Sequence, residues 1–338
     1  MRFSLFAMLA SLAFSHAGTF KGIEDPWSFD LNGNNADWMG NIPDNVHLSR
    51  LSIPGTHNSM TDKLDNSWIR SQNVPLKQQL TSGIRYFDIS CRLKGHQRVY
   101  HGPADTGYSL GYFMYTMFDF LDAHPGETII LRIRKGGILE DTQAFLSDID
   151  NYFISGSDFG DRAVNHIYSK GTDGITVVPT LGDVRGKIFI LQDFTTSPAG
   201  RYGLDWDSPS VSSYGYKLSL GTLSLPLKWI EAKAHIKWAG LRTSNKLRIT
   251  HTTASAGATP ISIAAGTSST LGMNGRLGKY LKKSEGNRIG IIAMDFPGQA
   301  LVNHIVSLND GYRDPQLTSP PSDGAAGATA GDFASDGQ

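Results

Sequence analysis

The stretch from residue 48 to residue 101 decides the fold of this chain. It contains LSRLSIPGTHNS at residues 48–59, GIRYFDISCRL at residues 83–93 and VYHGP at residues 99–103. Each segment is a short run of β-branched or aromatic residues that ends in polar groups near Gly or Pro, which is typical of a strand and its turn. His57 and His101 lie where two of these predicted strands end. Because parallel strands bring their C-terminal ends to one face of a sheet, we expect both histidines in one site.

Beyond this stretch the apolar pattern alternates between strands and helices. Further strands are predicted at 128–135, 187–194, 247–252 and 288–296, and helices at 74–81, 110–124, 141–153, 227–238, 275–283 and 299–308. This alternation predicts an α/β fold, a TIM-type parallel (β/α) barrel of irregular outline. Active groups of such barrels lie at the C-terminal ends of the strands, where His251 and Asp295 also fall.

Composition divides the chain into four parts. Residues 1–17 contain one basic residue and an apolar run before a small-residue site, which predicts a signal peptide and a secreted protein. Residues 18–46 predict an irregular arm, residues 47–312 a single barrel domain, and residues 313–338 a disordered tail rich in Ser, Pro, Gly and Ala.

Charge and cysteine content exclude several classes of protein. The 31 Lys and Arg residues balance 31 Asp and Glu residues, which argues against nucleic-acid binding and against strong attraction to anionic membranes. We expect any membrane contact to be peripheral, since the mature sequence has no long apolar run. Cys91 is the only cysteine, and its place in a predicted strand favours a small buried side chain. The sequence carries no indication of the oligomeric state.

Four motifs together resemble a known family. They are IPGTHNS (53–59), GIRYFD (83–88), YHGP (100–103) and PGETII (125–130). Their order is similar to that in the catalytic X region of phosphatidylinositol-specific phospholipases C, most of all the small secreted bacterial type. The resemblance continues through residues 183–188 to residues 288–296. It implies a barrel that cleaves membrane phosphatidylinositol, or its glycosylated relatives, to diacylglycerol and an inositol cyclic phosphate.

The resemblance also implies roles for three residues. His57 would remove the proton of the inositol 2-hydroxyl, His101 would protonate the departing glycerol oxygen, and Asp295 would orient His57. Histidine suits both proton transfers because its ordinary pKa is about 6.5. The alternative for Asp295 is an N-cap of the helix that follows.

The chain departs from the family at the phosphate-binding positions. Metal-independent relatives have an aspartate at Asn58 and an arginine at Ser90, whereas calcium-dependent relatives have an asparagine and a carboxylate there. Asp88 matches the family. Arg134 stands where calcium users have a glutamate, and a cation there disfavours Ca²⁺. We therefore expect no metal and no cofactor, with Arg134 or Arg92 supplying the positive charge; simple pairing of both arginines with acids is the alternative.

The headgroup positions differ as well. Asp193 stands where the family has an arginine, and a carboxylate accepts hydrogen bonds from inositol hydroxyls but donates none. Tyr216 is the candidate for stacking on the inositol ring, with Tyr202 and Trp206 as competitors. Asn58, Asp88, Asp193 and Tyr216 form the predicted substrate-binding set.

Two other functions remain open from the sequence. The first is a phosphodiesterase acting on another phospholipid headgroup, which the departures at Ser90 and Asp193 favour. The second is a secreted lipid-binding barrel without turnover. A binding protein needs no base, acid and orienting carboxylate together, and this favours an enzyme.

Overall fold

The computed structural model describes residues 18–137, 142–153, 158–171, 174–197, 199–215, 221–240, 245–254, 257–283 and 288–312. The predicted signal peptide, the predicted tail and Tyr216 lie outside these residues, so the predictions made for them stay predictions.

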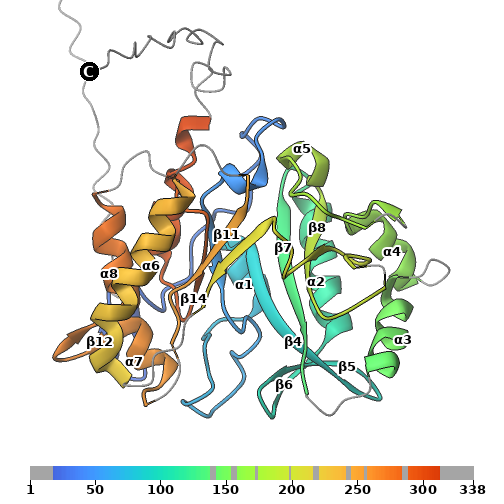
Figure 1. Ribbon diagram of the computed structural model, residues 1–338. Coiled ribbons are helices and arrows are strands. Elements are labelled where there is room, and N and C mark those ends of the chain that lie inside the picture. The colour runs from blue at the N-terminus through green and yellow to red at the C-terminus, as the bar shows by residue number, and fades with distance from the viewer. Residues whose placement is uncertain are drawn as a thin grey trace, which may run out of the picture.

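Eight parallel strands form a strongly curled sheet with helices on its outer face (Figure 1). Their order is β10 (Val211–Tyr214), β11 (Leu247–His251), β14 (Ile291–Met294), β3 (Ile53–Thr56), β4 (Tyr86–Lys94), β7 (Thr128–Lys135), β8 (Lys187–Asp193) and β9 (Leu204–Asp205). Every ladder between these neighbours is parallel. Among the described residues no ladder joins β9 to β10, so the barrel is open there. The predicted irregular parallel barrel is confirmed.

Nine α-helices of the described chain accompany these strands. They are α1 (Leu76–Thr81), α2 (Leu110–Ala123), α3 (Thr142–Phe153), α4 (Asp158–His166), α5 (Leu181–Val184), α6 (Leu225–Ala239), α7 (Pro260–Ala265), α8 (Met273–Leu281) and α9 (Gln299–Ser307). Short 3-10 helices lie at η1 (Leu48–Arg50), η3 (Gly221–Ser224) and η4 (Asp310–Tyr312). In the part of the chain described, no helix is both long and apolar enough to cross a bilayer.

Helix α2 shows how sequence sets one of these elements. The side chain of Ser109 caps its first turn by accepting a hydrogen bond from the backbone N–H of Tyr112 at 3.1 Å. Phe113, Met117 and Leu121 recur at helical spacing and are fully or almost fully buried. The helix ends just before Pro125, as expected for a residue that disfavours helical geometry in the residue preceding it.

The strand that carries His101 does not join the parallel set. β5 (His96–His101) pairs antiparallel with the long β4, and β6 (Ala104–Ser109) continues the hairpin. The expectation that His101 ends a parallel strand is therefore wrong. Gly95 reverses the chain with a φ of 75°, a conformation in which glycine is unstrained. Because Tyr100 pairs with Ser90, the hairpin still returns His101 to the part of β4 that carries Asp88.

The N-terminal segment is an integral part of the core. It contributes one hairpin, β1 (Gly18–Phe20) with β2 (Ile23–Asp25), and then an irregular path. Trp38 is buried along this path, and its indole N–H donates to the carbonyl of Gly83 at 2.9 Å. The second short hairpin, β12 (Gly266–Thr267) with β13 (Thr270–Leu271), precedes α8. Cys91 is fully buried, as predicted.

A buried ion pair connects the N-terminal segment to the barrel. Arg85 and Glu127 have fully buried side chains, and Nε of Arg85 donates to Oε2 of Glu127 at 2.8 Å. The same guanidinium donates to the carbonyl of Ala36 at 2.6 Å, while the other oxygen of Glu127 accepts the backbone N–H of Met39 at 2.8 Å. The pair therefore provides hydrogen-bond partners for backbone groups of residues 36 and 39, which are buried away from water.

We expect Arg85→Ala to lower the free energy of unfolding by about 3–5 kcal/mol, because it leaves the Glu127 carboxylate buried without its partner. Urea denaturation of the two proteins measures the difference. Arg98→Ala is the matched control, since Arg98 pairs with Asp105 at the surface and such pairs contribute about 1 kcal/mol or less. Equal losses in the two variants would contradict this account of the core.

Candidate active site

His57 follows the last residue of β3 and is held beside Asp295, which follows β14. Nδ1 of His57 lies 2.9 Å from Oδ1 of Asp295, and the carboxylate is only 2% exposed. The side chain of Gln72 donates to the carbonyls of both His57 and Met294, at 2.8 and 2.9 Å, and so joins the two strand ends. With Nδ1–H donated to Asp295, Nε2 of His57 is left as a proton acceptor.

The alternative role for Asp295 is not what the structure shows. Helix α9 begins with Gly298 at its N-cap, so Asp295 does not cap it. The carboxylate is instead committed to the histidine across the strand boundary. This places the predicted orienting residue and the predicted base in contact.

His101 approaches the same space from the β5 hairpin. Its Nδ1 lies 2.6 Å from the carbonyl oxygen of Ile69 and therefore carries a proton, while its Nε2 lies 3.1 Å from the amide nitrogen of Asn58. The ring centroids of His57 and His101 are 6.5 Å apart. Burial lowers the pKa of His101, and the nearby His57 adds to this effect, whereas the hydrogen bond to Ile69 opposes it.

Asn58 separates the two histidines in a left-handed conformation with a φ of 44°. Asparagine tolerates this region better than most residues, and the carbonyl of Asn58 is fixed by the hydroxyl of Thr61 at 2.9 Å. The tight turn after β3 thus aims His57 and Asn58 into one site.

Asp88 and Arg132 form the charged floor of the site. They are paired in register on β4 and β7, and a guanidinium nitrogen of Arg132 lies 3.3 Å from Oδ2 of Asp88. Burial alone would raise the pKa of Asp88, but Arg132 and Arg134 outweigh it and lower the value to about 2. Oδ1 of Asp88 is buried and accepts no hydrogen bond from the described residues.

Arg132 also reaches Asp193 at the end of β8. Two of its nitrogens lie 3.1 and 2.6 Å from one carboxylate oxygen of Asp193. Its guanidinium carbon lies 3.7 Å from the ring centroid of the half-buried Trp206. Asp193 is therefore ion-paired with Arg132 of the neighbouring strand β7. The positive charge that relatives carry at position 193 is supplied here by Arg132.

The other predicted arginines lie differently. Arg134 is in register with both Ser90 and Asp193, and its charge acts on Asp88. Its Nε is buried with no hydrogen-bond partner among the described residues. Arg92 lies four residues beyond Asp88, about 13 Å along the strand, with its guanidinium carbon 5.1 Å from the ring centroid of Tyr100. The structure brings Arg134 toward the site and leaves Arg92 at the outer part of the β4–β5 hairpin.

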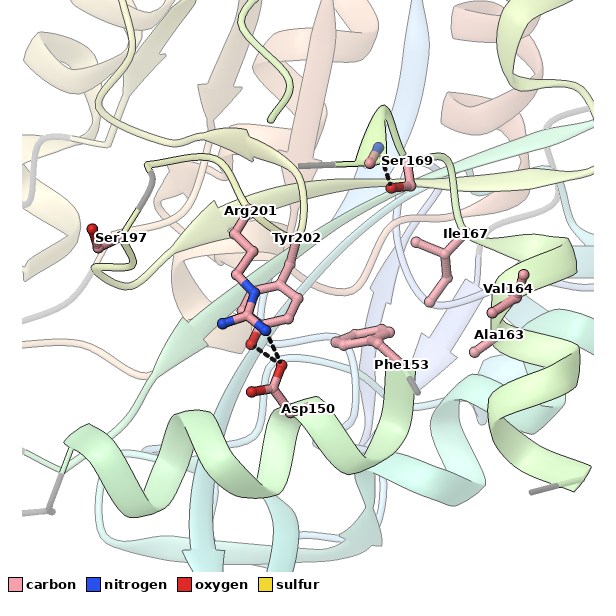
Figure 2. A pocket seen from close by; sticks show the side chains of 10 residues that line it. Asp150, Phe153, Ala163, Val164, Ile167, Ser169, Ser197, Arg201 and Tyr202 are labelled. Carbon is pink, nitrogen blue, oxygen red and sulfur yellow. Dashed lines mark hydrogen bonds and ion pairs between the residues drawn. The ribbon is translucent and has the colours of Figure 1, made fainter. Parts of the chain in front are cut away.

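Tyr202, a competitor for the stacking role, faces away from the site. Gln192 and Asp193 are neighbours on β8 and so point to opposite faces of the sheet. The backbone N–H of Tyr202 donates to Gln192, and its hydroxyl contacts Asp150 of α3. Tyr202, Asp150 and Phe153 line a cavity of about 530 Å³. Figure 2 shows the Tyr202 ring beside Asp150 and Phe153 of α3. Trp206 is the competitor that the structure brings to the charged floor.

One group of described residues has donors suited to a metal. His57, Asp88 and His251 each place one ligand atom within 4.8 Å of the others. Burial lowers the pKa of His251 well below its ordinary value, so its ring is neutral. Two imidazoles and one carboxylate suit a transition metal, whereas Ca²⁺ takes six to eight oxygens. Since Arg132 and Arg134 already act on Asp88, these residues do not fit the calcium ion that some relatives use.

Arg132 escaped the sequence prediction, and His251 was predicted only to lie at the C-terminal end of a strand, without a role. Arg132 stands two positions before Arg134 in the run LRIR, and alternate residues of a strand share a face, so the pattern contained this signal. His251 ends β11, and its ring centroid lies 5.6 Å from that of His57. Its place at a strand end was visible, but its closeness to His57 depends on the pairing of β11 with β14.

Comparison with known proteins identifies similar chains. The family model described as phosphatidylinositol-specific phospholipase C, X domain, matches residues 46–193. A 1-phosphatidylinositol phosphodiesterase of Listeria monocytogenes is 30% identical over 293 residues, covering 80% of this chain and 84% of that protein. A Staphylococcus aureus protein of the same name is 26% identical over 204 residues, covering 57% of this chain and 63% of that protein.

Solved structures agree with this similarity. The phosphatidylinositol-specific phospholipase C of Listeria monocytogenes superposes with a TM-score of 0.65 at 26% identity, covering 81% of this chain and 98% of that chain. A Staphylococcus aureus phosphatidylinositol-specific phospholipase C, solved in connection with modulation of its membrane binding, gives a TM-score of 0.65 at 20% identity. It covers 83% of this chain and 99% of that chain, and at this identity it shows the fold alone.

Proposed function

Because the chain belongs to the family of phosphatidylinositol-specific phospholipase C X domains, we propose that it cleaves phosphatidylinositol, free or glycosylated, to diacylglycerol and an inositol cyclic phosphate. The observation that supports the proposal is a pair of histidines on either side of Asn58, each with a different hydrogen-bond partner. His57 is held by a carboxylate and His101 by a backbone carbonyl, at a ring separation of 6.5 Å. We assign the proton-accepting role to His57 and the proton-donating role to His101, which must first take up a proton at Nε2, the atom that faces the Asn58 amide.

The first half of the reaction belongs to His57. Its Nε2 removes the proton of the inositol 2-hydroxyl as that oxygen attacks phosphorus. Asp295 holds the ring orientation and stabilises the imidazolium that forms. A positioned base of this kind contributes about 10²- to 10⁴-fold to the rate.

The second half belongs to His101. As the bond between phosphorus and the glycerol oxygen breaks, protonated His101 gives its Nε2 proton to that oxygen, and diacylglycerol leaves. Its lowered pKa makes the protonated form a stronger acid, but it also reduces the amount of that form at neutral pH. His57 later returns the proton that it took to solvent, and His101 takes one up from solvent, so the cycle balances.

The phosphoryl oxygens need positive charge in the transition state, and two arginines are placed to supply it. Arg132 lies against Asp88, and Arg134 has a buried Nε without a partner in the described chain. A phosphodiester offers acceptors to these donors, and its inositol hydroxyls offer donors to the free Oδ1 of Asp88. Asp193 and Trp206, both in contact with Arg132, are the candidates for holding the headgroup.

A headgroup panel tests the proposal. Purified protein is mixed with vesicles that contain phosphatidylinositol, phosphatidylcholine, phosphatidylethanolamine or phosphatidylglycerol, and diacylglycerol is measured. We expect release from phosphatidylinositol alone. Choline and ethanolamine carry no hydroxyl that could close a cyclic product, and the open-chain glycerol of phosphatidylglycerol lacks the ring of hydroxyls that Asp88 and Asp193 would bind. Release from another headgroup would indicate a different phosphodiesterase. Binding to vesicles without release from any of them would favour the inactive lipid-binding barrel.

The sequence of residues 1–17 leads us to propose that the protein acts outside the cell.

We expect Asn58→Asp to extend activity to higher pH. A carboxylate at this position would lie about as close to Nε2 of His101 as the present amide, and a nearby negative charge raises a histidine pKa. Because the acid must be protonated, raising the pKa of His101 moves the high-pH limb of kcat upward, by about one unit or more. The measurement is a pH profile of kcat for both proteins. An unmoved limb would show that His101 is not the acid.

A further inference from the structure

Helix α6 exposes a row of large apolar side chains. Leu223 in the preceding η3 turn is 84% exposed, and Leu227, Ile230 and Trp238 of the helix are 59%, 63% and 55% exposed. These positions follow one another at spacings of four, three and eight residues and so lie on one face of the helix. The opposite face buries Leu225, Ala232 and Ile236 in the protein core, along with its other inward residues. A helix that is apolar on both faces calls for a second apolar contact.

A cationic groove runs beside this row, between α6 and α8. Lys233, Arg276, Lys279 and Lys283 line it together with Trp229, Tyr280 and Leu271, around a cavity of about 280 Å³. The ammonium of Lys233 lies 5.6 Å from the ring centroid of Tyr280. The lining includes no acidic side chain among the described residues. In a chain whose formal net charge is zero, four cations in one groove are a local concentration of charge.

The topology relates this surface to the active site. Helix α6 leads into β11 and α8 leads toward β14, and each strand has its C-terminal end in the site, at His251 and just before Asp295. A helix that feeds a parallel strand runs opposite to it, so the N-terminal ends of α6 and α8 lie on the site's side of the barrel. Leu223, Leu227 and Leu271 belong to these ends, whereas Trp238, Lys279 and Lys283 lie at the C-terminal ends of the two helices, so the surface extends along the flank of the barrel away from the site. Figure 1 shows α6 and α8 side by side at the edge of the barrel away from α3 and α4.

We propose that the exposed row of α6 and the cationic groove form a docking surface for an anionic lipid bilayer. The interface of such a bilayer offers acyl chains to the leucines, isoleucine and tryptophan, and phosphate groups to the lysines and arginine. A second copy of the chain fits less well, because a two-fold contact would bring two cationic grooves near each other. The proposal rests on the proposed function only in taking the substrate to be a membrane lipid.

Two pairs of substitutions separate the two parts of the surface. Lys279→Glu with Lys283→Glu is expected to weaken binding to vesicles of phosphatidylcholine and phosphatidylglycerol by about 25-fold or more, since each lysine near an anionic surface contributes about fivefold. Binding to pure phosphatidylcholine should change little. Leu227→Ser with Ile230→Ser is expected to weaken binding to both kinds of vesicle by about tenfold or more, because it removes buried apolar area.

Matched controls lie elsewhere on the protein. Val164→Ser with Val177→Ser alters two valines that are each 56% exposed, and Lys170→Glu with Lys187→Glu makes the same charge change away from α6 and α8. Both controls should bind vesicles as the unmodified protein does. Cosedimentation measures binding, and a monodisperse short-chain phosphatidylinositol measures turnover without a membrane.

The outcomes are distinct. Loss of vesicle binding in the two test pairs, with short-chain turnover retained, supports the docking surface. The same loss in a protein that cleaves no phosphatidylinositol would retain the surface and refute the proposed activity. Unchanged binding in both test pairs would overturn the proposal. Dimers in the unmodified protein that become monomers in Leu227→Ser with Ile230→Ser would overturn it too, since they would assign the surface to a second copy.

Discussion

Replacing His57 with alanine is expected to lower the rate of phosphatidylinositol cleavage by about 10⁴-fold, while vesicle binding stays unchanged. The loss is at the upper end for a general base because the attacking group is a hydroxyl, which is a poor nucleophile until its proton is removed. Asp295 would remain in place without a base to orient. The measurement is kcat on vesicles and on a short-chain soluble substrate.

The control for this variant is His96→Ala, which removes an exposed histidine at the start of β5. A substrate with a good leaving group distinguishes the roles proposed for the two histidines. A nitrophenyl inositol phosphate needs no proton on its leaving oxygen, so it should restore much of the activity of His101→Ala and little of that of His57→Ala. If the nitrophenyl substrate instead restored the activity of His57→Ala, the roles of the two histidines would be reversed. If His57→Ala cleaved phosphatidylinositol about as fast as His96→Ala does, His57 would have no role in catalysis.

Arg132→Ala is expected to lower kcat by about 10²- to 10³-fold, the cost of removing one preorganised donor from a developing negative charge. Arg132 reaches Asp88, Asp193 and Trp206 at once, so its guanidinium is fixed before substrate arrives. This arrangement avoids the reorganisation that a flexible side chain would need. The measurement is kcat and KM on short-chain phosphatidylinositol, with unfolding monitored in parallel.

A second variant separates charge from geometry at this position. Arg132→Lys keeps a cation near Asp88 and Asp193, so the fold is retained, but it loses the planar fork of donors. We expect it to recover no more than about tenfold of the loss. Arg98→Ala, which removes an arginine paired with Asp105 on the exposed part of the hairpin, is the control. Full activity in Arg132→Lys would show that Arg132 acts as a simple counter-ion to the two aspartates.

Much of the barrel could be predicted because its strands are strongly apolar and its helices strongly periodic. The prediction for β7 at residues 128–135 coincides with the strand, and that for α2 differs by one residue. Helices α4, α5 and α7 and strands β6, β9 and β10 were missed. Helix α4 is rich in polar residues, and α7 is six residues of mostly small side chains, so neither shows a long apolar period. The capping residue Thr259 followed by Pro260 was the available signal for α7.

Site residues carried on short motifs could be placed from the sequence, while those that depend on lateral strand pairing could not. His57 and His101 were expected in one place, and they are, although β5 turned out antiparallel. The resemblance indicates Arg134, the second arginine of LRIR, whereas the arginine that contacts Asp88 and Asp193 is Arg132. The register of β7 against β8, together with side-chain length, decides which arginine reaches Asp193. This register cannot be predicted from the sequence of either strand alone.

We have proposed that His57 and His101 close a cyclic phosphodiester on inositol without a metal. Phosphorus NMR of the protein with phosphatidylinositol vesicles tests it most directly, first in EDTA and then with added calcium, beside His57→Ala. We expect a cyclic inositol phosphate signal in EDTA that calcium does not increase and that is lost in His57→Ala. A signal that appears only with calcium would contradict the metal-free site, and a signal that persists in His57→Ala would contradict the role of His57.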